Sequence, residues 1–151
     1  KALANPSTWR FKVYREESRK ELSVKLGDLY KELTPENLFK EEKLKKIIAR
    51  PFLSSVAIVI CMKRGDNEKI PEIEEVQAVA CAVQNICLTA TAYGLGSFWS
   101  SPKIIYSDQM KSYLKLKSED KCLGILYLGY PTIDWPKGQR KPIEYLTEWN
   151  D

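Results

Sequence analysis

Residues 71–93 constrain the fold of this chain more than any other segment. Small and apolar side chains recur there on two stripes at helical spacing. A helix that is apolar around most of its circumference cannot face water in a small domain, so we expect it to be central or covered by a second subunit. Gly94 follows as the usual residue after a helix end. The first stripe comprises Ile73, Val76, Val79, Ala80, Val83, Ile86, Cys87, Ala90 and Thr91, and the second comprises Ala78, Ala82, Leu88 and Ala92.

Four other segments have the patterns of strands. Residues 9–14 alternate apolar and polar side chains, which predicts a half-buried strand. Residues 56–62 and 122–130 are apolar on both faces, as interior strands are. Residues 96–99 form a brief extended piece. With 151 residues and 44% hydrophobic content, the chain predicts one α+β domain around a single core.

Three further helices are expected. Residues 16–33 carry leucines at helical spacing among Lys and Glu, which indicates an amphipathic surface helix. Thr34 and Pro35 predict the start of a second helix over residues 35–49, closed by Pro51. Ser107 is a candidate N-cap for a short helix that runs to about Leu114.

Composition disfavours several classes of partner. The formal charge is +4, from 24 Lys and Arg against 20 Asp and Glu, and the charges are interspersed, which argues against nucleic acid. No segment has the length and apolarity of a membrane span or the form of a secretory signal. The four cysteines contain no CxxC pair, so we expect buried free thiols and a soluble, cytoplasmic protein. They are Cys61, Cys81, Cys87 and Cys122.

The absence of histidine restricts the chemistry further. With His 0, catalytic triads, His-ligated zinc and imidazole bases are excluded. Any reaction must use carboxylates, amines, thiols or a cofactor. Glu74, Glu75 and Gln77 lie near the start of the long helix, where acidic side chains favour the positive end of the helix dipole. We assign these three residues no catalytic role.

Several stretches occur together in a recognisable order. They are residues 9–11 (WRF), 69–71 (KIP), 81–83 (CAV), 94–99 (GLGSFW) and 126–131 (LYLGYP). As a set they resemble the nitroreductase family, in its smaller, single-domain branch. The resemblance covers nearly the whole chain.

The resemblance implies a three-layer sandwich whose central, mostly antiparallel sheet is flanked by helices. It also implies a homodimer with the long helices at its interface, FMN in the cleft between subunits, and residues 131–151 packed on the partner subunit. Hydride would pass from NAD(P)H to flavin N5 and then to a nitroaromatic, a quinone or a similar small-molecule acceptor. Such chemistry needs no catalytic side chain.

The resemblance also suggests cofactor-binding residues. Trp99, Ser100 and Ser101 match the place where similar proteins meet the flavin, although Trp99 could equally be a core residue. Lys137 and Arg140 match the basic stretch that meets the FMN phosphate, for which the planar guanidinium is suited. The alternative for these two is a solvated basic tail.

The segment before Trp9 departs from the family pattern. Similar proteins have a whole loop there, whereas residues 6–8 span about 10 Å when fully extended. We therefore expect the chain to be discontinuous or truncated before Trp9, with an incomplete flavin site. The alternative function is a dimeric flavin-binding or degenerate small-molecule-binding protein without turnover. A basic RNA-binding module is disfavoured by the apolar long helix and the interspersed charges.

Overall fold

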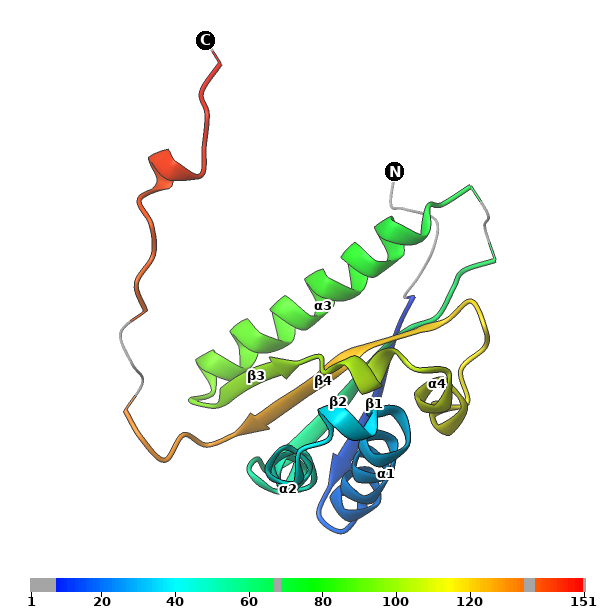
Figure 1. Cartoon of the computed structure of the whole chain (residues 1–151). Coiled ribbons are helices and arrows are strands. Elements are labelled where there is room, and N and C mark those ends of the chain that lie inside the picture. Colours follow the sequence, from blue (N-terminus) through cyan, green and yellow to red (C-terminus); the bar gives the residue numbers. More distant parts are fainter. Residues whose placement is uncertain (1–7, 67–68, 135–137, 151) are drawn as a thin grey trace.

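A four-stranded antiparallel sheet forms the centre of the computed structural model, which describes residues 8–66, 69–134 and 138–150. The strand order is β1-β2-β4-β3, so β2 and β4 are interior and β1 and β3 are edges (Figure 1). This order explains why the two strands predicted to be interior are apolar on both faces. The strands are β1 (Trp9–Arg15), β2 (Val56–Met62), β3 (Gly96–Ser100) and β4 (Lys121–Gly129).

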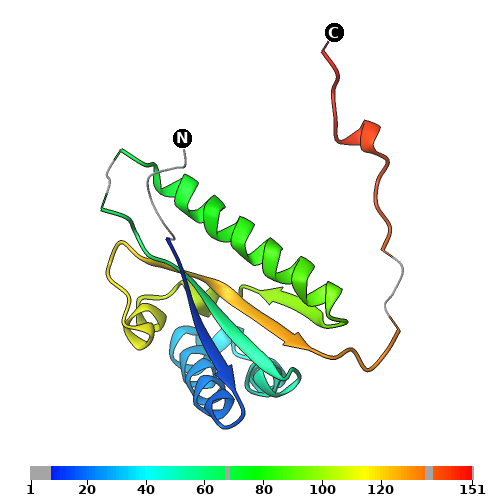
Figure 2. The same cartoon turned by 180° about the vertical axis from the view of Figure 1, so that it is seen from behind.

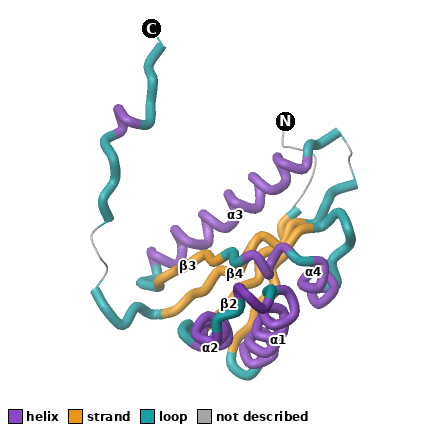
Figure 3. Tube along the Cα trace, in the orientation of Figure 1, coloured by secondary structure: helices purple, strands orange, loops and turns teal. Residues whose placement is uncertain are grey.

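Helices cover both faces of the sheet, which gives three layers. Helix α3 (Glu72–Ala92) lies alone on one face, and α1 (Ser18–Leu33), α2 (Glu41–Ala49) and α4 (Asp108–Leu114) lie on the other (Figures 1 and 3). The expected α+β fold with a flanked antiparallel sheet is confirmed. We call the two sides the α3 face and the α1/α2/α4 face.

The α1/α2/α4 face is closely packed. Leu22 and Leu29 of α1 are fully buried against strand residues such as Val59. Helices α1 and α2 approach closely at Gly27, where an added Cβ would lie 2.9 Å from Ile48 Cγ1. The core beneath α1, α2 and α4 is therefore complete within one chain, while Phe98 on the same face of the edge strand β3 remains 56% exposed.

The α3 face is packed on one side of the helix only. Val79 and Val83 are buried against Ile60 and its neighbours in the sheet. On the opposite side of α3, Ile73 and Leu88 are each 59% exposed. Within a single chain the long helix is not central. Of the two alternatives, coverage of the helix by a second subunit stays a prediction.

The helix predicted over residues 35–49 is wrong in its first part. Residues Glu36–Leu38 form a 3-10 turn, and Phe39 and Lys40 are extended before α2 begins. The Lys40 N–H donates to the Tyr30 hydroxyl at 3.1 Å, and the rings of Tyr30 and Phe39 lie 5.3 Å apart. These contacts hold the chain extended where propensity alone favours a helix.

The other predicted elements are confirmed within a few residues. Ser107 caps α4 by accepting the Met110 N–H at 3.1 Å. The expectation of buried thiols holds for Cys61 and Cys122, but it is wrong for Cys81, which is exposed, and Cys87 is only half-buried. Both lie on α3, whose far side is not covered by any of the residues that the structure describes. Among the described residues, no helix combines the length and apolarity of a membrane span.

The C-terminal tail projects from the end of β4 away from the sheet (Figures 1 and 2). It contains one 3-10 turn, Ile143–Tyr145. Tyr145, Leu146 and Trp149 are 75%, 72% and 78% exposed. The expected break before Trp9 concerns residues that lie outside the described part of the chain.

Candidate functional site

Trp99 is fixed on the α3 face by an irregularity in β4. The register between β2 and β4 shifts between Ile60 and Cys61, which leaves Leu123 as an extra residue, or β-bulge. The Trp99 indole Nε1–H donates to the Leu123 carbonyl at 3.1 Å. Gly124 lies beneath the ring with φ +136°, and an added Cβ would be 2.4 Å from Trp99 Nε1. The bulge therefore holds the indole edge while 39% of the residue stays exposed.

Ser100 and Ser101 are placed differently from Trp99. Ser100 pairs with Ile125 in the ladder, so its side chain lies on the α1/α2/α4 face, where its hydroxyl accepts from Arg50 at 3.5 Å. Ser101 is exposed and follows the last ladder pair. The three residues are consecutive in the sequence, but their side chains lie in different surroundings.

The two basic residues expected at the phosphate are separate from this strand in one chain. Arg140 is exposed in the tail beside Lys141 and Tyr145. Lys137 lies outside the described residues. The cavity beside Arg140 is lined by tail residues, and the tail leaves the sheet whose strand β3 carries Trp99 (Figure 1).

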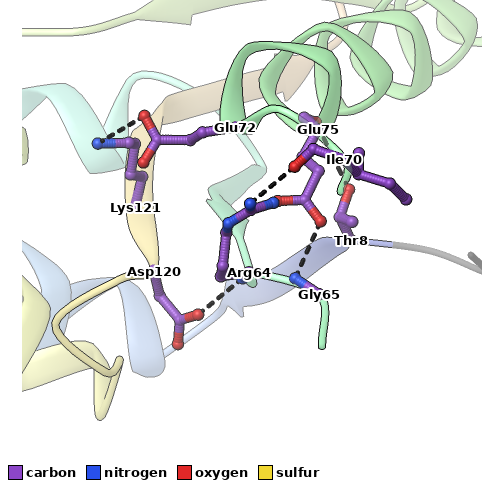
Figure 4. A network of polar contacts seen from close by, with 8 residues as sticks. All are labelled: Thr8, Arg64, Gly65, Ile70, Glu72, Glu75, Asp120 and Lys121. Carbon is purple, nitrogen blue, oxygen red and sulfur yellow. Dashed lines mark hydrogen bonds and ion pairs between the residues drawn. The ribbon is translucent and has the colours of Figure 1, made fainter. Parts of the chain in front are cut away.

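A buried ion pair anchors the start of α3, and sequence reasoning missed it. Glu75 is 2% exposed, and its carboxylate pairs with the Arg64 guanidinium and accepts the Gly65 N–H at 2.9 Å (Figure 4). Arg64 also donates to the Ile70 carbonyl at 2.7 Å. We call Arg64, Gly65 and Glu75 the Glu75 clasp. Its sequence signal is an acid at the inward position of an otherwise apolar helical stripe.

Asp120 extends this network to the loop before β4. Its carboxylate accepts the Arg64 N–H at 2.9 Å and the Lys117 N–H at 3.0 Å, and the residue is 3% exposed. Lys121 pairs with Glu72 at 3.3 Å. Figure 4 shows these contacts converging where β2 ends, β4 begins and α3 starts. The network is fully engaged in holding these segments, so we assign it a structural role.

The buried Cys61 thiol is not a nucleophile at neutral pH. A hydrogen bond with Cys122, followed by burial, raises the pKa of the Cys61 thiol, so Cys61 stays protonated at neutral pH. Within residues 8–66, 69–134 and 138–150, no cluster of His, Cys, Asp or Glu is placed to hold a metal ion.

The order of these elements has a match among known proteins. The profile of the nitroreductase family matches residues 4–130, which span the sheet and α3. The chain belongs to the nitroreductase family. The match extends from the segment before β1 to the residue after β4, and the tail lies outside it.

Curated relatives match over a shorter stretch. The protein named "Putative NAD(P)H nitroreductase YdjA" from Escherichia coli (strain K12) is 31% identical over 83 residues, covering 55% of this chain and 45% of that protein. "Putative NAD(P)H nitroreductase YfhC" from Bacillus subtilis (strain 168) is 26% identical over 86 residues, covering 57% and 44%. The matched stretch spans less than half the length of either relative.

Solved structures of the family share the fold over nearly the whole chain. A nitroreductase-like family protein from Bacillus cereus has a TM-score of 0.77 at 27% identity, covering 97% of this chain and 75% of that one. The FMN-dependent nitroreductase NfnB from Mycobacterium smegmatis, solved with NADPH, has a TM-score of 0.67 at 14% identity, covering 95% and 79%. The "putative nitroreductase in complex with fmn" from Desulfovibrio desulfuricans has a TM-score of 0.62 at 24% identity, covering 95% of this chain and 73% of that one.

Proposed function

We propose that this chain is an FMN-dependent NAD(P)H oxidoreductase that transfers hydride through flavin N5 to a nitroaromatic, a quinone or a similar acceptor. The observation that carries the proposal is the family match across residues 4–130. NfnB, which is FMN-dependent and was solved with NADPH, and the FMN-bound Desulfovibrio protein have the same fold. The four free cysteines, including exposed Cys81, agree with a reducing cytoplasm.

The residues at the end of β3 fit a planar cofactor. Trp99 Nε1–H is occupied by the Leu123 carbonyl, so the indole offers its apolar ring and not a donor. Ser101 offers an exposed hydroxyl, while the Ser100 hydroxyl already accepts from Arg50. When bound, FMN supplies the hydride chemistry, and the chain orients it and excludes water.

A second copy of the chain would supply the phosphate site. Arg140 forms no ion pair within the described part of the chain and lies in a tail that leaves its own sheet. We propose that residues 131–151 pack on a partner subunit and bring Lys137 and Arg140 to its FMN phosphate. Arg is suited to this role by its planar pair of donors.

The outer side of α3 supports the proposed homodimer. Ile73 and Leu88 are each 59% exposed there, and Tyr93, which follows the helix, is 76% exposed. A groove of about 360 Å³ runs beside the C-terminal half of the helix, with Ile86, Ala90 and Leu128 in its lining. An apolar helix face with small residues suits the close approach of a second helix.

The cofactor is tested by titrating FMN and following the quenching of its fluorescence, then measuring oxidation of NADH and NADPH with menadione and with nitrofurazone. Saturable binding with acceptor-dependent turnover is expected. Arg140→Ala should weaken FMN binding by about 1.5 to 3 kcal/mol, the range for hydrogen bonds to charged groups, and Lys31→Ala on α1 is the matched control. Binding without turnover would favour the degenerate binding protein, and absence of binding would contradict the cofactor proposal.

The dimer is tested by sedimentation of the wild type, Leu88→Glu and the control Lys20→Glu. We expect dimers for the wild type and the control and monomers for Leu88→Glu, because a charge at the centre of an apolar interface is left without a partner. A wild-type monomer at micromolar concentration would refute the proposed assembly.

A further inference from the structure

Two cavities on the α1/α2/α4 face share one wall. The larger has a volume of about 450 Å³, with Leu53, Phe98 and Tyr130 in its lining. The smaller has a volume of about 210 Å³ and lies against α2. Arg50 and Tyr127 line both. We call this pair the Arg50 cavities; their total size is within the range of small-molecule sites.

The Arg50 cavities carry positive charge without a balancing acid. Lys43, Lys46 and Arg50 recur at helical spacing along α2 and the turn after it, and all three line the smaller cavity. No carboxylate lines either cavity, and none of the three cations forms an ion pair within the part of the chain that the structure describes. Such an arrangement attracts an anion.

Arg50 is held in position by contacts that leave most of its guanidinium N–H donors available. Its guanidinium lies 5.3 Å from the centre of the Phe98 ring, and one of its nitrogens donates to the Ser100 hydroxyl at 3.5 Å. A guanidinium has five N–H donors, so these contacts orient it without using its capacity for a bidentate anion.

Tyr127 provides a second, independent sign of a ligand. The residue is 6% exposed, and its hydroxyl forms no hydrogen bond with another described residue. Because every fully buried side-chain N or O atom of the described residues has a partner, this unpaired hydroxyl opens to the cavity and is available to a ligand. Burial, opposed by Arg50, raises the pKa of Tyr127 to about 12, so its hydroxyl is a donor at neutral pH. A donor on the common wall of two cavities, beside Arg50, is placed to meet an acceptor from outside the chain.

The larger cavity indicates what the anion is attached to. Phe98 and Tyr130 are 56% and 76% exposed, and Leu53 is 80% exposed. Aromatic walls of this kind suit a planar ring. Lys46 and Arg50 lie at the C-terminal end of α2, whose partial negative charge disfavours a doubly charged phosphate relative to a single carboxylate.

We propose that the Arg50 cavities bind an aromatic monocarboxylate. The carboxylate meets Arg50, Lys46 and the Tyr127 hydroxyl, and the ring lies against Phe98 and Tyr130. This site is on the face of the sheet opposite α3, so it goes beyond the proposed flavin chemistry and does not depend on it.

The probe is 2-naphthoate, titrated into the full chain by calorimetry and followed by amide chemical shifts. We expect saturable binding with the largest shifts in β3 and in residues 50–54. Arg50→Met should weaken binding at least about tenfold, or 1.4 kcal/mol, and Tyr127→Phe should weaken it several-fold while keeping the ring in place. Lys45→Met on α2 and Tyr106→Phe are matched controls, because neither residue lines these cavities, and they should bind as the wild type does.

Uncharged 2-naphthamide separates charge recognition from simple burial of a ring. It should bind at least about tenfold more weakly than 2-naphthoate, and equal binding would overturn the proposal. Tighter binding of 2-naphthyl phosphate would overturn the choice of a carboxylate. Loss of 2-naphthoate binding in Tyr106→Phe, or its retention in both Arg50→Met and Tyr127→Phe, would place the ligand elsewhere.

Discussion

The two faces of the sheet differ in how completely a single chain buries their apolar side chains. On the α1/α2/α4 face, Leu22, Leu29 and Met110 are fully buried within one chain. On the α3 face, Val79 is fully buried on the inner side of the helix while Leu88 remains 59% exposed on the outer side. The first face stabilises the subunit, and the second leaves apolar surface for another layer.

The polar contacts of the two faces differ as well. The α3 face is secured at one end by the Glu75 clasp, whose polar atoms are paired within the chain (Figure 4). The α1/α2/α4 face contains Arg50 without a carboxylate partner and Tyr127 without a hydrogen-bond partner among the described residues. Paired polar groups hold structure, and unpaired ones are where a ligand is best sought.

The largest expected effect separates the two faces by stability. Leu29→Ala on the covered face should lower the free energy of unfolding by about 3 kcal/mol, because it leaves a cavity in a closed core. Leu88→Ala should cost less than about 0.5 kcal/mol in dilute protein, with a cost that grows with concentration as copies associate. Urea unfolding at two protein concentrations measures both. Equal costs at high dilution would break the comparison.

Alkaline unfolding tests the hydroxyl of the buried residue Tyr127 on the α1/α2/α4 face. The pKa of Tyr127 is raised from 10.0 to about 12, chiefly by burial. The unfolded chain loses this proton near pH 10, whereas the native chain keeps it to near pH 12, so the associated stability is present below pH 10 and is lost between the two values. The loss should reach about 2 kcal/mol at pH 12.

Tyr127→Phe should remove this part of the fall, and the exposed Tyr106→Phe should retain it. The difference between the wild-type and variant curves of unfolding free energy against pH isolates the contribution of Tyr127 from those of other titrating groups. Parallel curves from pH 9 to pH 12, a range that covers the rise from the unfolded to the native pKa, would show that this hydroxyl is not desolvated.

The sequence predicts the elements better than their contacts. The strands, α1 and α3 follow from apolar periodicity, because period 2 and period 3.6 are local properties of the chain. The interruption at Lys40 depends on Tyr30, ten residues earlier, and the bulge that fixes Trp99 depends on pairing between β2 and β4. Neither is visible in a local pattern.

The candidate site shows the same division. Family resemblance selects Trp99, Ser100 and Ser101, but it does not reveal that the Ser100 hydroxyl accepts from Arg50. The inward position of Glu75 is visible in the sequence from the spacing of the apolar stripe, but its partner is not. A carboxylate at a helix start is usually solvated, and only the return of Arg64 from the end of β2 gives it a partner.

The Glu75 clasp provides the next prediction. Glu75→Gln keeps the shape of the side chain but removes its charge, which leaves Arg64, 21% exposed, without its partner. We expect a loss of about 2 kcal/mol in unfolding free energy, below the range for fully buried pairs because water reaches Arg64. Neighbouring Glu74→Gln is the control, since Glu74 is exposed. Amide hydrogen exchange should become faster first in residues 72–76. Unchanged exchange there would show that the Glu75 clasp does not anchor the start of α3.

The smallest expected effect concerns the edge of the α3 face. Trp99→Phe keeps an aromatic ring over Gly124 but removes the Nε1–H that donates to the Leu123 carbonyl at 3.1 Å. One neutral hydrogen bond contributes about 1 kcal/mol, so a loss of that size in unfolding free energy is expected, with Trp149→Phe in the exposed tail as the control. The same change should weaken FMN binding only slightly if the ring face, and not the N–H, meets the flavin. A variant as stable as the wild type would show that the bulge keeps its shape without this hydrogen bond. The indole of the wild-type protein would then not be held in its orientation by the bulge.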